Sequence, residues 1–172
     1  MDLPAFIIML FAIITGVAIA VVAMGMMNKD KKVSTKYDER QKIARGKSYA
    51  WGFYAMMISA AIFMLLSLLD LTKVFGGYSY FTILIIGCIV QVVHSIFNDA
   101  YIGLNNNPKK YMIFMSVIAA INACSAIAGF VNGEMIKDGV FQSAYLNLLC
   151  TLLFAAIAAA FGIKALIDRK DK

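Results

Sequence analysis

Residues 31–51 read KKVSTKYDERQKIARGKSYAW and separate two long apolar runs. The whole chain of 172 residues is 62% hydrophobic and only 15% charged, whereas about a quarter of the residues are charged in typical soluble domains. Half of the sixteen lysines and arginines nevertheless fall within 28–47. An apolar chain that concentrates its charge in this way is typical of a membrane protein, and the charged segment determines how the apolar runs are arranged.

Five apolar runs are each long enough to cross a bilayer, because a hydrocarbon layer of about 30 Å takes about 20 helical residues. Only helices satisfy their own backbone hydrogen bonds at that depth. The sequence therefore predicts an all-α, polytopic transmembrane helical bundle that forms a single membrane domain over 1–172. The five spanning helices are expected at about 5–27, 48–69, 78–98, 111–131 and 140–163. The first is expected to be a spanning helix rather than a signal peptide, since no basic segment precedes it.

The distribution of basic residues predicts the orientation of the bundle. All lysines and arginines except Lys73 and Lys137 fall in 28–47, 99–110 and 164–172. Five crossings bring these three segments to one side of the membrane, and the positive-inside rule makes that side the cytoplasm. The N-terminus is therefore expected outside and the C-terminus in the cytoplasm.

The charged segment also carries a helix start. Thr35 is expected to cap the helix, with Asp38 in the first turn, where a carboxylate complements the helix dipole. Glu39 and Lys42 are spaced as a favourable pair. No proline follows before Leu69, so one helix is expected to rise from the cytoplasmic extension at 28–47 into the second crossing.

Three interpretations of this segment compete. It is a topology determinant that lies among anionic lipid headgroups, or it is a docking site for a protein partner. Lipid binding alone does not require the mixed charges, which motivate the docking interpretation, with the candidate residues Asp38, Glu39, Arg40, Lys42 and Arg45. A catalytic pair of Asp38 and Glu39 is disfavoured, because adjacent helical side chains point about 100° apart. No nucleic-acid partner is expected, since topology accounts for the basic residues.

The run YDERQ at 37–41, followed by RGK at 45–47 and an aromatic-rich crossing, carries a family resemblance. It is similar to a pattern in uncharacterised small multi-pass membrane proteins of Gram-positive bacteria. This resemblance implies a multi-pass protein of the bacterial plasma (cytoplasmic) membrane, and it implies no activity.

Polar residues inside the crossings form a second candidate site. Gln91, His94 and Asn98 share one stripe of the third helix, and Asn122 and Asn147 lie in the fourth and fifth. They either line a hydrated cavity or proton path between these three helices, with His94 as the proton carrier, or form hydrogen bonds between helices. The second interpretation is favoured, because no charged residue lies in the middle of any crossing.

Catalytic motifs of the HExxH, GxSxG and Walker types do not occur. Cys88, Cys124 and Cys150 have no metal-ligand spacing and are expected to be small packed residues. We therefore expect a non-enzymatic integral membrane protein without cofactor or metal. It is expected to be an accessory or interaction subunit that docks a partner through its basic segment, and its expected assembly is with a protein partner or as a homo-oligomer. The alternatives are a small transporter or channel that uses the polar residues, and, third, an intramembrane enzyme.

Overall fold

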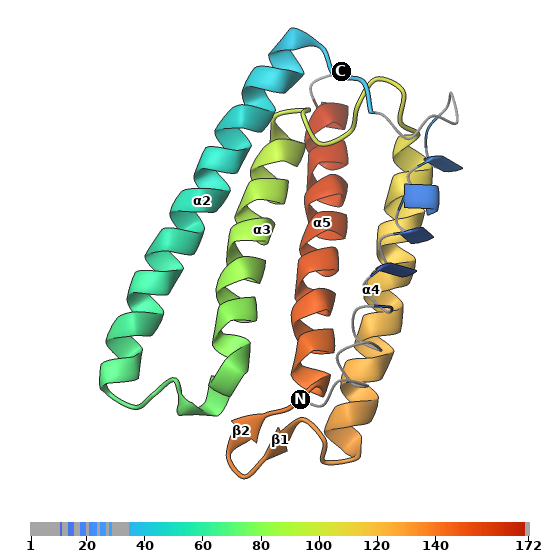
Figure 1. Cartoon of the computed structure of the whole chain (residues 1–172). Coiled ribbons are helices and arrows are strands. Elements are labelled where there is room, and N and C mark those ends of the chain that lie inside the picture. The colour runs from blue at the N-terminus through green and yellow to red at the C-terminus, as the bar shows by residue number, and fades with distance from the viewer. Residues whose placement is uncertain are drawn as a thin grey trace.

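The computed structural model describes residues 35–170 and isolated positions between 11 and 28 (Figure 1). Four long helices dominate this part of the chain: α2 (Glu39–Leu68), α3 (Ser79–Phe97), α4 (Pro108–Val131) and α5 (Ala144–Lys170). A short 3-10 helix, η1 (Lys73–Tyr78), connects α2 to α3, and a hairpin of β1 (Ile136–Lys137) and β2 (Val140–Phe141) connects α4 to α5. The protein is thus an all-α membrane protein with several crossings.

Four helices among the described residues are long and apolar enough to span a membrane, not the five expected from the sequence. The expected first helix at 5–27 lies mostly outside the described residues. The five-helix count and the orientation derived from it therefore remain predictions.

The helices stand side by side in the order α2, α3, α5, α4 (Figure 1). The packed centre lies between α3 and α5, where Ile96 and Ile157 are almost completely buried. Large apolar side chains point outward from the two edge helices, among them Ile58 on α2 and Phe130 on α4. Water would disfavour such an apolar surface, so the surrounding solvent is lipid.

Small residues allow the closest helix contacts, as expected of helices in membranes. A Cβ atom added to Gly52 of α2 would lie 3.0 Å from the carbonyl oxygen of Gly87 in α3, and one added to Gly87 would lie 3.0 Å from that of Gly52. On the other side of the row, a Cβ atom at Gly129 of α4 would lie 2.4 Å from that of Ala144.

α2 runs without a break from the charged segment through the apolar run that follows, so the expected continuity of this helix is confirmed, whereas the cytoplasmic position of its start stays a prediction. Its 30 residues correspond to about 45 Å, longer than the hydrocarbon thickness of about 30 Å. The cap, however, is Asp38 and not Thr35. The Asp38 carboxylate accepts a hydrogen bond from the backbone N–H of Gln41 at 2.6 Å, and the Gln41 side chain accepts one from the backbone N–H of Asp38 at 3.3 Å.

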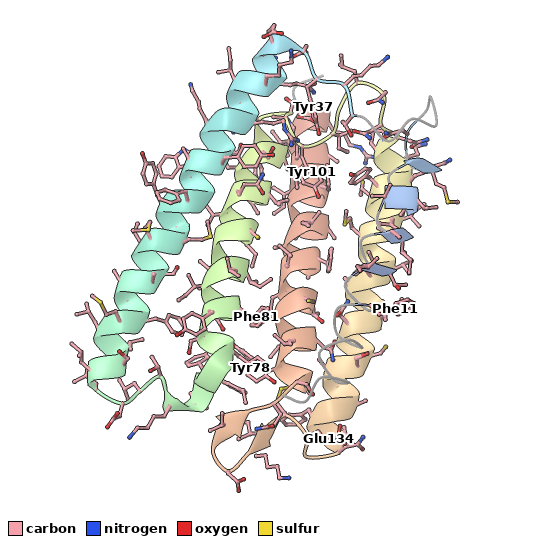
Figure 2. The ribbon with its side chains drawn as sticks, in the orientation of Figure 1. Phe11, Tyr37, Tyr78, Phe81, Tyr101 and Glu134 are labelled. Carbon is pink, nitrogen blue, oxygen red and sulfur yellow. The ribbon has the colours of Figure 1, made fainter. Side chains whose placement is uncertain are left out.

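α5 begins at Ala144 rather than at residue 140 and continues to Lys170, past the expected end at 163. The reason lies in Asp138 and Gly139, which adopt positive φ angles of 50° and 74° and form the hairpin turn that this residue pair favours. The hairpin end also holds an aromatic cluster, whose members include Phe141 stacked on Tyr145 at 4.1 Å between ring centroids. Figure 2 shows Tyr78 at this end of the bundle and Tyr37 and Tyr101 at the other end.

The expectation that the cysteines are packed residues is wrong for Cys88 and Cys124, which are exposed, whereas Cys150 is half-buried. Because the helices form a row, even α3, which has a neighbour on each side, keeps a face on the outside of the bundle. An apolar sequence does not distinguish that face from the packed one.

Candidate functional site at the charged end of the bundle

All described lysines and arginines except Lys73 and Lys137 lie at one end of the bundle. This charged end consists of residues 35–48, 98–110 and 161–170, at the top of Figures 1 and 2. It brings together the start of α2, the α3–α4 loop, the start of α4 and the end of α5. The described parts of the three basic segments therefore share one side.

The α3–α4 loop is bound to the segment that leads into α2. The backbone N–H of Leu104 donates to the carbonyl of Lys36 at 2.8 Å, and the backbone N–H of Lys36 donates to Oδ1 of Asn105 at 2.8 Å. Gly103 packs so closely that an added Cβ atom would lie 2.6 Å from the Lys36 carbonyl oxygen. The Asn106 amide also donates to Oδ1 of the buried Asn28. The loop is therefore an ordered part of the site.

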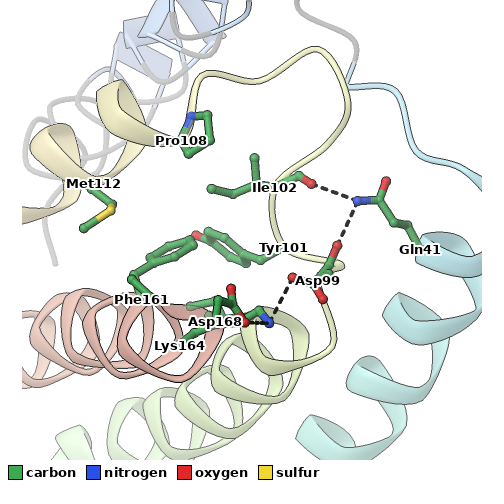
Figure 3. A pocket seen from close by; sticks show the side chains of 11 residues that line it. Gln41, Asp99, Tyr101, Ile102, Pro108, Met112, Phe161, Lys164 and Asp168 are labelled. Atoms are coloured by element: carbon green, nitrogen blue, oxygen red, sulfur yellow. Dashed lines mark hydrogen bonds and ion pairs between the residues drawn. The ribbon is translucent and has the colours of Figure 1, made fainter. Parts of the chain in front are cut away.

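Gln41 connects the helix cap to this loop. Its side-chain amide donates to the backbone carbonyls of Asp99 at 2.8 Å and Ile102 at 3.1 Å (Figure 3). Gln41 is not among the docking residues that the sequence predicts. The available signal was its position three residues after Asp38, which is the spacing of a capping box.

Arg45 is held by tyrosines. Its guanidinium donates to the hydroxyls of Tyr37 and Tyr49, each at 2.7 Å, and to the carbonyl of Ala100 at 3.4 Å. It also lies 4.2 Å from the centroid of the Tyr37 ring, a favourable cation–π distance. Burial raises the pKa of Tyr37, and the nearby Arg45 charge opposes that rise only partly. The guanidinium therefore binds the α3–α4 loop to α2.

The five predicted docking residues thus fall into two groups. Asp38 caps α2, and Arg45 binds the α3–α4 loop. Glu39, Arg40 and Lys42 lie on the open surface, with side chains 83%, 80% and 57% exposed. Their ion pairs, Glu39 with Lys42 at 2.6 Å and Arg40 with Asp99 at 3.9 Å, are exposed, and such pairs contribute little to stability. These three side chains are available for a partner.

The polar stripe of α3 contacts α2. Nδ1 of His94 forms a 2.9 Å hydrogen bond with the hydroxyl of the buried Ser48, which also donates to the Ala44 carbonyl at 2.8 Å. The Gln91 side chain packs against Gly52, which also lies in α2. Asn98, at the exposed end of the stripe, donates to the His94 carbonyl at 2.7 Å.

Asn122 and Asn147 lie elsewhere. The Asn122 amide donates to the Ile118 carbonyl of its own helix at 2.9 Å, and Asn147 is half-buried in α5, its carbonyl bonded to the Thr151 hydroxyl at 2.7 Å. Because α5 stands between α3 and α4, the predicted polar residues are divided among different parts of the bundle rather than gathered at one interface.

Among the described residues, no group of three or more histidine, cysteine, aspartate or glutamate side chains is placed to hold a metal ion. No family model matches the chain, and no curated protein or solved structure matches it.

Proposed function

We propose that the protein is a non-enzymatic membrane subunit that docks a protein partner on the first turn of α2. The observation that carries this proposal is the exposure of Glu39, Arg40 and Lys42 on a turn that the contacts of Gln41 and Arg45 hold in place. A surface presented in a fixed geometry loses little conformational freedom on binding. Mixed charges favour one partner over others through complementary potentials.

The proposed setting is a bacterial plasma membrane, with the charged end in the cytoplasm and 5–27 forming a fifth crossing that starts outside. Two observations support it: the gathering of basic residues at one end, which the positive-inside rule associates with the cytoplasm, and the resemblance of the YDERQ segment. Basic residues near anionic headgroups each contribute about 1 kcal/mol of attraction, so this segment also contacts lipid.

A transporter or channel is the other function class, and it would need a continuous polar path. The contacts of His94 with Ser48 and of Asn122 with its own helix support hydrogen bonding within and between helices instead.

The docking proposal is tested by the double variant R40E/K42E, which reverses two exposed charges without touching Asp38 or Arg45. The matched control is K73E/K137E at the opposite end. We expect a protein that co-purifies with the wild type from its native membrane to be lost from R40E/K42E and retained by the control. The same co-purified proteins in all three preparations would refute the proposal.

A further inference from the structure

A cavity of about 400 Å³ opens at the charged end, beside the docking surface but separate from it (Figure 3). This volume lies within the range of small-ligand sites. Its walls come from all four long helices and the α3–α4 loop, so the fold as a whole forms it. Its lining includes Asp99, Tyr101, Met112, Phe161, Lys164 and Asp168.

One wall of the cavity is apolar and aromatic. Tyr101 of the loop and Phe161 of α5 meet edge to face, with ring centroids 5.6 Å apart, and Met112 of α4 lies across from them (Figure 3). Aromatic rings attract cations through their faces. This wall suits an organic cation better than a hydrated inorganic ion.

The other wall is polar and carries more negative than positive charge. Nζ of Lys164 lies 3.1 Å from Oδ1 of Asp99 and 3.2 Å from Oδ1 of Asp168, so two carboxylates share one ammonium. The Lys164 side chain is only 18% exposed. Nη2 of Arg40 lies 3.9 Å from Oδ2 of Asp99 on the outer side of the cavity. Because the Arg40 side chain is exposed, it compensates the Asp99 charge only weakly. Among the described residues the Asp168 carboxylate bonds only Lys164, which leaves an acceptor for a second cation.

We propose that this cavity binds an organic ammonium group. The Asp168 carboxylate, which shares the Lys164 ammonium with Asp99, accepts hydrogen bonds from the ligand's ammonium group, while Tyr101 and Phe161 contact the carbon atoms of the ligand. The cavity lies at the first turns of α4 and the last turns of α5, where spanning helices leave the hydrocarbon. An ethanolamine phospholipid reaches such a position from the bilayer, and a free amine reaches it from the water. The site does not depend on the docking proposal.

The proposal is tested with the purified full-length protein in a nonionic detergent. Bound lipid is counted by native mass spectrometry with phosphatidylethanolamine or phosphatidylglycerol added, and free ethanolamine is titrated as a competitor. We expect preferential retention of phosphatidylethanolamine. The variant D168N keeps the shape of the side chain and removes its charge, and we expect it to weaken retention about tenfold, as for the loss of a hydrogen bond between charged groups.

Two further variants complete the experiment. D138N removes a carboxylate at the opposite end and serves as the matched control, with unchanged retention. M112W fills the cavity without changing its charge and should also reduce retention, so the proposal stays testable if D168N folds poorly. If free ethanolamine displaces the bound lipid, the ligand's ammonium group comes from a soluble amine. If free ethanolamine does not displace the lipid, the ammonium group comes from the lipid headgroup. The proposal would be overturned if the protein retains both lipids equally, or if neither phosphatidylethanolamine nor ethanolamine binds. Retention at the wild-type level by D168N and M112W would also overturn it.

Discussion

Arg45 shows how one side chain can fix the geometry of a surface without belonging to it. Its planar guanidinium reaches two tyrosine hydroxyls and a loop carbonyl at once, which the single ammonium of a lysine does not reproduce. The sequence places Arg45 correctly in the charged segment. It does not reveal that Tyr37, eight residues earlier, folds back over it, because that contact depends on the path of the chain before α2.

The variant R45A should loosen the α3–α4 loop. We expect it to lower the free energy of unfolding by about 1–2 kcal/mol, the scale of hydrogen bonds to a charged group that is only partly buried. Hydrogen exchange should accelerate at the backbone amide of Leu104. The control K47A removes an exposed charge on the same helix and should leave both quantities unchanged. If exchange in the loop is the same in R45A and the wild type, Arg45 does not hold it.

The tyrosines of the charged end should titrate late. Burial raises the pKa of Tyr37 and of Tyr101 above the ordinary value, because the phenolate is the charged form. The stability they contribute is therefore fully present below about pH 10, the unfolded value, and is lost as the pH rises through the higher folded values.

Absorbance of tyrosinate during an alkaline titration checks this expectation. Among the eight tyrosines of the chain, the fraction that titrates last should shrink in Y37F and in Y101F relative to the wild type. A single transition near pH 10 in both variants and the wild type would contradict the burial of these hydroxyls.

At the scale of elements, Gly52 and Gly87 allow α2 and α3 to approach each other. The variant G52A places a methyl group 2.6 Å from Cβ of Gln91 and 3.0 Å from a backbone carbonyl, and overpacking of this kind costs about 1–3 kcal/mol. The measurement is reversible unfolding in mixed micelles. The control is G46A in the same helix, where no atom lies within 4 Å of the added group. If G52A is as stable as G46A, the helices are not in close contact.

Helix positions follow from the sequence more readily than helix neighbours. Runs of apolar residues predict where α3 and α4 lie, because only length and polarity decide what crosses a bilayer. The start of α5 was misplaced because Val140 and Phe141 extend an apolar run, although Asp138-Gly139 signals a hairpin. The place of α5 between α3 and α4 has no such signal, since packed and lipid-facing residues are equally apolar.

For the same reason the sequence predicts the polar residues at an interface that the row of helices does not form. The spacing of Gln91 and His94 correctly predicts that they share one face of a helix. Its partner, Ser48, was part of the predicted second crossing. Nothing in the spacing of these residues indicates that the stripe turns toward α2 rather than toward α5.

At the scale of the whole molecule, the two ends of the bundle differ in charge and in the features that they carry. The described residues of the charged end include the proposed docking surface, the bound loop and the cavity proposed to bind an ammonium group, while the opposite end has the hairpin and an aromatic cluster. Both proposals place their ligands at the charged end. The docking proposal additionally requires that this end face the cytoplasm.

Labelling of single cysteines in intact cells tests that orientation most directly. The native cysteines are first replaced, and L104C at the charged end is compared with E134C at the hairpin end, both at exposed positions. A membrane-impermeant maleimide should label E134C in intact cells and L104C only after the membrane is permeabilised. Labelling of L104C and protection of E134C in intact cells would place the charged end outside and contradict the account.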